Sequence, residues 1–324
     1  MSIAKAWLKA GIRRAARWVP RKPRPAILMY HRIGVETFDP WGLVVEPDRF
    51  AAQTEWLARN RTMLPLMDFA RLHQERQLPP DAVSLTFDDG YASVLHAVSL
   101  FQAHAIHATV FLPVEIIEQR RRFWWDELAQ MIIGWPAETL QLDGTRLSVS
   151  PAQEHEERWP PETSPRTPRQ KLFESLWSRL HAMRPAVLGA AMAQLREQAP
   201  TALGATDRPL TPEELRAVST DTISFGSHGL AHPSLPVLRH EEKLREIAES
   251  HARCEALTGT APAAFAYPFG ELDNASALLV KHAGYTCACA TGDAFVSSRS
   301  DRFALPRLRA GNWEVSGLRD MLGE

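Results

Sequence analysis

Short apolar runs alternate along the chain with longer stretches in which apolar positions recur at helical spacing. Residues 26–30 and 108–112 are almost continuously apolar, as in buried parallel strands. Residues 47–59 and 239–258 have the amphipathic period of helices that cover a sheet. This alternation favours an α/β fold with parallel strands. The other elements we expect are strands at 83–87, 222–225, 263–267 and 285–290 and helices at 91–104 and 273–283.

The middle of the chain interrupts this alternation. Residues 113–210 contain the sequence Trp124-Trp125-Asp126, some amphipathic helix and a proline-rich polar stretch. Strand and helix signals resume afterwards, so we interpret this region as an insertion, at about 113–210, in one catalytic domain spanning residues 26–324. Residues 1–25 form a separate basic segment.

Charge is distributed unevenly along the 324 residues, although the net charge is only −1. Residues 1–25 hold eight Lys or Arg and no acid, which leaves 29 basic against 38 acidic residues in the remainder. An acidic body argues against nucleic acid as a partner. The basic segment has no apolar core of signal-peptide length, so we expect a cytoplasmic protein. Two interpretations of the segment stay open: peripheral contact with the inner membrane surface, or a helix docked on the domain or frayed.

Polar side chains gather where the expected strands end. His31 follows the strand at 26–30, Asp88 and Asp89 follow the strand at 83–87, and His228 and His232 follow the strand at 222–225. The carboxyl ends of parallel strands open on one face of a barrel, so these side chains should meet. Two histidines and one carboxylate suit a divalent metal that assists hydrolysis, and the second Asp is then available as a base. Taken singly, Asp-Asp-Gly is also a common turn and a lone histidine pair is often not a ligand.

Three motifs together resemble the polysaccharide deacetylases of carbohydrate esterase family 4. They are Thr86-Phe87-Asp88-Asp89-Gly90, His228-Gly229-Leu230-Ala231-His232-Pro233 and Phe265-Ala266-Tyr267-Pro268-Phe269-Gly270. The resemblance covers roughly residues 26–112 and 211–310. It implies an irregular (β/α) barrel and removal of N-acetyl, or alternatively O-acetyl, groups from sugar polymers with one divalent metal ion. Zn is the first expectation, with Co, Ni, Mn and Fe as alternatives.

The resemblance also assigns roles by position. Asp88 matches the catalytic base, and the backbone N–H of Tyr91 matches a group that helps to hold the oxyanion. The metal ligands that it implies are Asp89, His228 and His232. Pro268 and Phe269 of the third motif are expected at the substrate.

Three departures from the family pattern change the assignment. Gly229 stands where a Ser or Thr is usual, which removes a supporting hydrogen bond rather than a ligand. Ala266 stands where an Arg usually orients the base, and we hypothesise that Arg307 supplies this guanidinium instead. The usual late histidine acid is missing. His31, in Leu28-Met29-Tyr30-His31, resembles the early acid histidine of exopolysaccharide deacetylases; the alternative is a histidine satisfied in the core.

These observations favour a metal-dependent hydrolase that deacetylates an N-acetylated polysaccharide or a lipid-linked sugar precursor. One alternative is a deformylase or another sugar amide hydrolase of the same fold, and another is a non-catalytic carbohydrate-binding module. The complete set of Asp88, Asp89, His228 and His232 favours the enzyme, because a decayed site usually loses its ligands first. Trp124 and Trp125 have two interpretations, a sugar-stacking wall or an anchor for the insertion.

Overall fold

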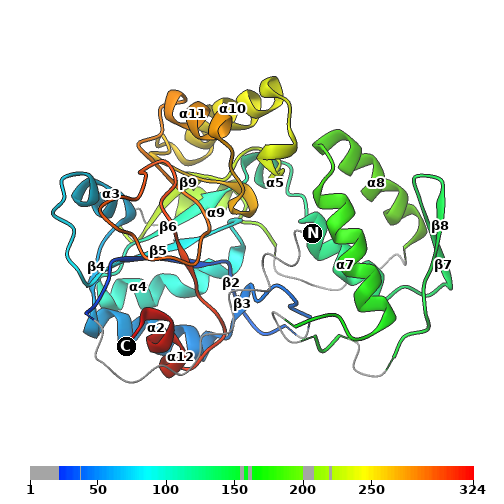
Figure 1. Ribbon diagram of the computed structural model, residues 1–324, viewed down its shortest axis with the longest axis horizontal. Helices are drawn as coiled ribbons and strands as arrows, with labels where there is room; N and C mark the ends of the chain where they lie inside the picture. The colour runs from blue at the N-terminus through cyan, green and yellow to red at the C-terminus, as the bar shows by residue number, and fades with distance from the viewer. Residues whose placement is uncertain (1–21, 37, 154–156, 160–162, 200–207, 219–220) are drawn as a thin grey trace. The chain divides into compact units, whose positions relative to one another are not determined.

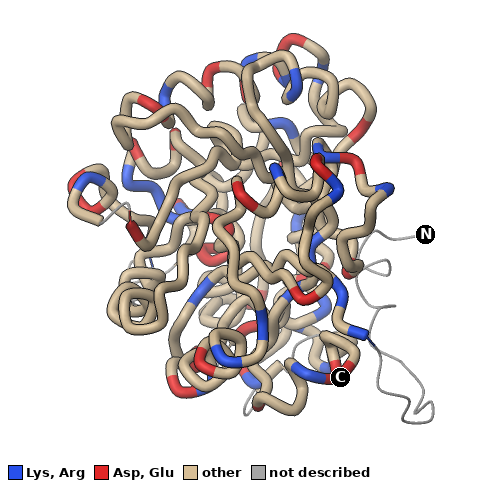
Figure 2. The backbone as a smooth tube through the Cα atoms, turned by 90° about the vertical axis from the view of Figure 1, so that its left-hand side faces the viewer, with Lys and Arg blue, Asp and Glu red and all other residues tan. Residues whose placement is uncertain are grey.

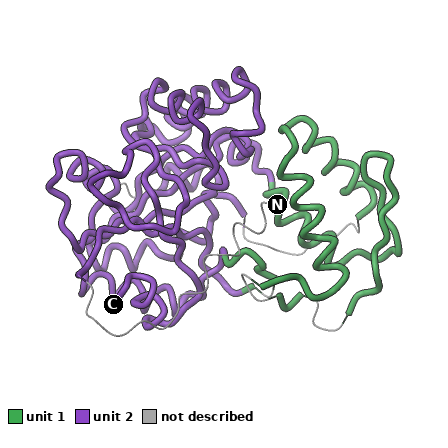
Figure 3. Tube along the Cα trace, viewed as in Figure 1, with its two compact units in different colours: residues 1–14, 36–42, 122–206 green, residues 15–35, 43–121, 207–324 purple. Residues whose placement is uncertain are grey.

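The computed structural model describes residues 22–36, 38–153, 157–159, 163–199, 208–218 and 221–324. The basic segment therefore lies almost entirely outside the described residues. The chain divides into two compact units (Figure 3). The larger unit comprises residues 15–35, 43–121 and 207–324, and the smaller unit includes residues 36–42 and 122–206.

A parallel sheet forms the centre of the larger unit (Figure 1). Its buried strands read as almost continuous apolar runs because both faces are covered, which is why the sequence pattern located most of them. In spatial order the strands are β11 (Cys287–Cys289), β10 (Ala264–Ala266), β9 (Ile223–Ser227), β6 (Ala108–Leu112), β5 (Ala82–Phe87), β1 (Ala26–Tyr30) and β12 (Leu308–Arg309), with β4 (Thr62–Met63) paired to β5.

The two ends of this strand order meet through one segment of the chain. Leu305 forms a parallel bridge with Cys289, and its carbonyl accepts a hydrogen bond of 2.9 Å from the N–H of Ala290. Three residues further on, Leu308 pairs in parallel with Leu28 of β1. Because this short segment joins β11 to β1, the sheet curls into a ring. The predicted α/β class and irregular (β/α) barrel are confirmed.

Helices of the larger unit cover the outside of the sheet (Figure 1). Pro47 at the first position starts α2, and the Asp273 side chain caps α11 by accepting from the N–H of Ser276. The predicted helix at 91–104 is only partly correct, because its first half is the 3₁₀ helix η1 (Ala92–Ala97). The other helices are α2 (Pro47–Asn60), α3 (Leu66–Gln74), α4 (Val98–His104), α5 (Val114–Glu118), α9 (Pro212–Ala217), η2 (Leu235–Val237), α10 (His240–Thr258), η3 (Pro268–Gly270), α11 (Asn274–His282) and α12 (Val315–Leu322). A short parallel pair, β2 (Arg32–Ile33) and β3 (Val44–Val45), lies outside the main sheet.

The smaller unit has an aromatic core of its own. Phe173 and Trp177 of α7 pack against Phe38 and Trp41, with ring centroids 5.3 and 4.7 Å apart. A capping box at Thr167 begins α7. The elements of this unit are α6 (Trp124–Ile133), the antiparallel hairpin of β7 (Thr139–Leu142) and β8 (Thr145–Ser148), α7 (Pro168–His181) and α8 (Pro185–Gln198).

Acidic and basic positions are interspersed along the backbone, as Figure 2 shows. No helix among the described residues is long and apolar enough to cross a membrane. The three cysteines, Cys254, Cys287 and Cys289, are buried free thiols.

Candidate metal and catalytic site

The two neighbouring carboxylates lie in a sharp turn at the end of β5. Asp89 has φ of +69° and Gly90 has φ of +62°, so two successive residues are left-handed. A side chain at Gly90 would also begin 2.8 Å from Leu112 Cδ2, which leaves no room for a larger residue. The N–H of Asp88 is held by the Tyr30 carbonyl at 2.9 Å. The turn directs Asp88 and Asp89 to different partners, and both are 4% exposed.

The two histidines stand at the ends of an irregular loop that follows β9. The His228 N–H bonds to the Leu112 carbonyl at 2.8 Å, which fixes the start of the loop. Gly229 has φ of +79° and His232 has φ of +56°. The His-x3-His spacing therefore lies in a loop and not in a helical turn. A non-glycine residue held at positive φ stores backbone strain, which is common at functional sites.

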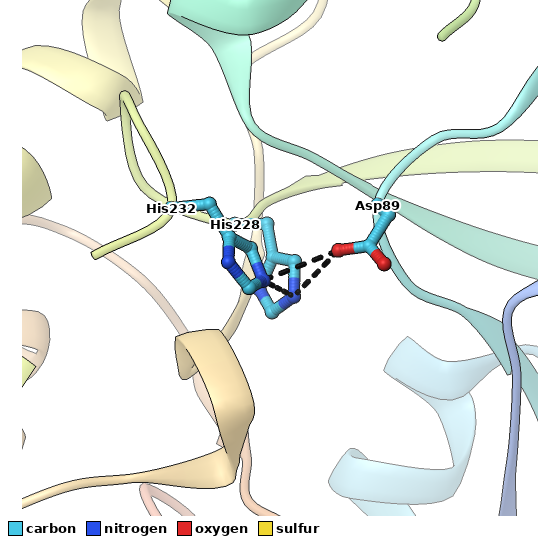
Figure 4. A group of neighbouring side chains, drawn as sticks. All are labelled: Asp89, His228 and His232. Carbon is cyan, nitrogen blue, oxygen red and sulfur yellow. Dashed lines mark hydrogen bonds and ion pairs between the residues drawn. The ribbon is translucent and has the colours of Figure 1, made fainter. Parts of the chain in front are cut away.

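Asp89, His228 and His232 converge on one point (Figure 4). Oδ1 of Asp89 lies 3.2 Å from His232 Nε2 and 3.7 Å from His228 Nε2, and the two Nε2 atoms are 3.1 Å apart. His228 Nδ1 lies 2.7 Å from the Ala266 carbonyl, so this nitrogen donates its proton and leaves Nε2 with a lone pair. Burial lowers the pKa of His228 to about 4, so the ring is neutral at pH 7.

This donor set fits a divalent metal. Ligand bonds of about 2.0–2.2 Å at tetrahedral angles place donor atoms roughly 3.4 Å apart, which is close to the spacings here. The backbone acceptor of His228 is the kind of outer partner that orients metal-binding imidazoles. Burial alone would raise the pKa of Asp89, but the charge and hydrogen bond of His232 outweigh burial and lower it. The carboxylate is therefore ionised, as a ligand must be.

Asp88 pairs with a guanidinium from the segment that closes the barrel. Arg307 donates from Nη1 to Oδ1 and from Nη2 to Oδ2 of Asp88, both at 2.6 Å. Burial would raise the pKa of Asp88, but Arg307 and then His228 hold it well below its usual value. Arg307 is itself fully buried and also donates to the Ala290 carbonyl and Thr86 Oγ1. The structure thus brings Arg307 onto Asp88, as hypothesised, while Ala266 contributes its carbonyl to His228 instead.

His31 follows β1 and is partly exposed at the same face. Burial lowers the pKa of His31, opposed by the charges of Asp89 and Asp88. The charges of both carboxylates therefore act on the His31 imidazole. Its role as the acid stays a prediction.

Tyr91 follows the turn that carries Asp88 and Asp89, and the third motif contacts His232 through Phe269. The backbone on either side of Tyr91 is fixed, because the Gly90 carbonyl accepts from Leu210 N–H and the Ala92 N–H donates to the Arg208 carbonyl. Phe269 has φ of +57°, and its ring packs edge-on against His232 with centroids 4.5 Å apart. Pro268 is buried at the start of η3.

Trp124 and Trp125 belong to the smaller unit and are 7% and 5% exposed. Trp125 stacks on Phe123 at 4.8 Å, and Trp124 packs on Trp177 at 5.9 Å. These contacts give both rings a packing role within the smaller unit. Contact with sugar stays a prediction.

Sequence reasoning missed three groups that support the site. Thr86 Oγ1 accepts from Arg307, and the Ala266 carbonyl orients His228. Glu246 of α10 accepts from the backbone between the two histidines. The first two lie within the quoted motifs, but Glu246 resembles any other acid of a charged amphipathic helix and gave no signal.

Comparison with known proteins confirms the resemblance seen in the motifs. Residues 186–288 match the model of the family described as polysaccharide deacetylase. The matched segment contains the second and third motifs and excludes Asp88, Asp89 and Arg307. No curated protein matches the chain.

Three solved structures share the fold at low sequence identity. The Streptococcus pyogenes deacetylase PplD in complex with acetate is 16% identical, with a TM-score of 0.60 over 93% of this chain and 99% of that one. IcaB from Ammonifex degensii is 14% identical, with a TM-score of 0.58 over 93% and 98%. The putative polysaccharide deacetylase BA0330 from Bacillus anthracis is 17% identical, with a TM-score of 0.57 over 93% of this chain and 69% of that chain.

Proposed function

We propose that this chain, which has the motifs, the family match and the fold of the polysaccharide deacetylases, is a metal-dependent sugar deacetylase. The observation that carries the proposal is the buried cluster of Asp89, His228 and His232 directly beside the Asp88–Arg307 ion pair. A cluster of metal-ligating side chains alone occurs in many kinds of protein. Such a cluster next to a carboxylate kept ionised by a buried guanidinium favours a hydrolase.

Each residue of the site has a distinct task in this proposal. Asp89, His228 and His232 would hold the metal, which when bound would lower the pKa of water and polarise the substrate carbonyl. Asp88 accepts the proton of the attacking water, and Arg307 fixes its orientation through two hydrogen bonds. The Tyr91 N–H would donate to the oxygen of the tetrahedral intermediate. His31, which follows β1, protonates the leaving amine.

The substrate that we propose is an N-acetylated glycan or glycolipid, with an O-acetyl ester as the alternative. The family match supports the acetylated polysaccharide, and the neighbour solved with acetate has the same fold. We propose Zn as the metal because two imidazoles and one carboxylate with an open position are typical of catalytic zinc. We also propose a cytoplasmic location, with residues 1–25 as the segment that would contact the inner membrane surface.

Release of acetate from a panel of N-acetylated glycans tests this function. The protein is assayed as purified, after chelation, and after chelation followed by Zn, Co, Ni, Mn or Fe. We expect acetate release that chelation abolishes and one metal restores. His228→Ala, His232→Ala and Asp89→Ala should each lower metal content in elemental analysis, because three protein ligands leave no spare.

The same assay distinguishes the alternatives. Formate in place of acetate would identify a deformylase. Release of neither acid from any glycan, together with retained glycan binding, would identify a binding module. Full metal content in all three ligand variants would show that the metal lies elsewhere.

A further inference from the structure

A buried carboxylate from α10 touches the loop that carries both histidines. Oε2 of Glu246 accepts hydrogen bonds from the N–H of Leu230 at 2.8 Å and of Ala231 at 3.2 Å. Glu246 is only 7% exposed, although an ionised side chain is costly to bury without partners. Its two partners are backbone groups between His228 and His232. None of the catalytic steps proposed above uses this residue.

The loop needs support from outside because it has no secondary structure of its own. Gly229 and His232 are both left-handed, so the N–H groups between them do not enter a helix or a strand. The carbonyls of Gly229 and Leu230 accept from the N–H groups of Val114 and Glu115, at 3.1 and 3.0 Å. The start of α5 therefore holds the carbonyl side of the loop. Glu246 holds its N–H side.

Gly229 leaves space for the Glu246 carboxylate. A Cβ atom at this position would lie 3.2 Å from Glu246 Oε2, which is tighter than most real Cβ contacts. A larger side chain would press on the carboxylate as well as straining a backbone at φ of +79°. Gly229 replaces the Ser or Thr that is usual at this position. The absence of a side chain there leaves room for the Glu246 carboxylate, which accepts from the next two N–H groups.

We infer that Glu246 is a positioning residue that sets the affinity of the site for its metal. By fixing the peptides of Leu230 and Ala231 it determines where His232 begins relative to His228. The Nε2 atoms of the two histidines then lie 3.1 Å apart, so the loop does not have to rearrange when the metal binds. Outer partners that orient ligands typically contribute 10–100-fold to metal affinity. The inference rests on the metal site of the proposed function.

Three variants separate positioning from general stability. Glu246→Ala removes the acceptor, and Glu246→Gln keeps an oxygen that can accept the same two bonds. Cys254→Ala is the matched control: it lies on the same helix and is fully buried, and its thiol contacts the Gly226 carbonyl of β9 rather than an N–H group of the loop. Zinc affinity is measured by competition with a chromophoric chelator. Hydrogen exchange of the Leu230 and Ala231 amides is measured in the metal-free protein.

We expect Glu246→Ala to weaken zinc binding about 10–100-fold and to accelerate exchange of both amides. Glu246→Gln should stay within a few-fold of the wild type, and Cys254→Ala should keep wild-type affinity despite a lower melting temperature. Equal affinities of Glu246→Ala and Cys254→Ala, with unchanged amide exchange, would overturn the inference. A wild-type protein that binds no metal would instead overturn the proposed function, and amide exchange would still show whether Glu246 holds the loop.

Discussion

Replacing Arg307 with Met should destabilise the metal-free protein by about 3–5 kcal/mol, the usual cost of leaving a buried charge without its partner. Arg307 is fully buried, and both oxygens of Asp88 accept from it at 2.6 Å. Methionine fills much of the volume but offers no donor, so the Asp88 carboxylate stays in a 4% exposed position without its counter-ion. Thr86 Oγ1 and the Ala290 carbonyl also lose a donor. The expected loss in the free energy of unfolding is therefore larger than the loss from one neutral hydrogen bond.

A double-mutant cycle isolates the pair from these other losses. Asp88→Asn alone leaves the guanidinium with a neutral partner, whereas Asp88→Asn combined with Arg307→Met leaves no buried charge at all. The double variant should therefore cost less than the sum of the single variants, by about 2 kcal/mol or more.

Urea unfolding of the chelated proteins measures this coupling. Tryptophan fluorescence and circular dichroism should give coincident transitions, and equal slopes should show that the variants expose the same surface. Additivity within about 0.5 kcal/mol would refute the reasoning, because it would mean that the two charges do not stabilise one another.

Three further predictions address other parts of the site. Asp88→Asn should retain metal in elemental analysis yet lose about 10²–10⁴-fold in turnover, because an amide cannot accept the proton of water; a metallated and active variant would show that the base is elsewhere. His31→Ala should slow hydrolysis of an N-acetyl amide more than hydrolysis of an activated aryl acetate, whose leaving group needs no proton. Equal losses of rate on the two substrates would show that His31 has a packing role and is not the acid. Burial raises the pKa of Glu246 from 4.5 to about 7, so the folded metal-free protein binds more protons than the unfolded chain between these pH values and loses stability as pH rises through 7. Glu246→Gln should remove this dependence, which amounts to at most about 3 kcal/mol between pH 4 and pH 8, and the same pH dependence in melting temperature for both proteins would contradict it.

The fold was predictable where local pattern and tertiary burial agree. Strands such as β1 and β6 are buried on both faces and therefore read as apolar runs. The ends of two other strands, β5 and β9, located Asp88, Asp89 and both histidines. The strand β12 has two residues, too few for any period, and its pairing depends on contacts with β1 that are distant in sequence. Local pattern could therefore suggest Arg307 as the partner of Asp88, but only the tertiary structure establishes the pair.

Two other features could not have been found from the pattern. The first half of the helix expected at 91–104 is tightened into η1, where buried Ser93 accepts from the N–H of Ile33. Glu246 lies on α10 among many charged residues, and a helical period cannot show which acid faces a loop far away in the sequence. In both cases the deciding contact is non-local.

The segment that closes the barrel also sets the order in which the site becomes complete during synthesis. A nascent chain that has emerged as far as Gly270 already carries the three proposed metal ligands, Asp89, His228 and His232. It still lacks Arg307, which enters only when residues 305–309 dock between β11 and β1. Until then Asp88 has no guanidinium to orient it. Proteolysis that removed this segment would have the same effect, because it would leave the three proposed metal ligands in place and take away the guanidinium that pairs with Asp88.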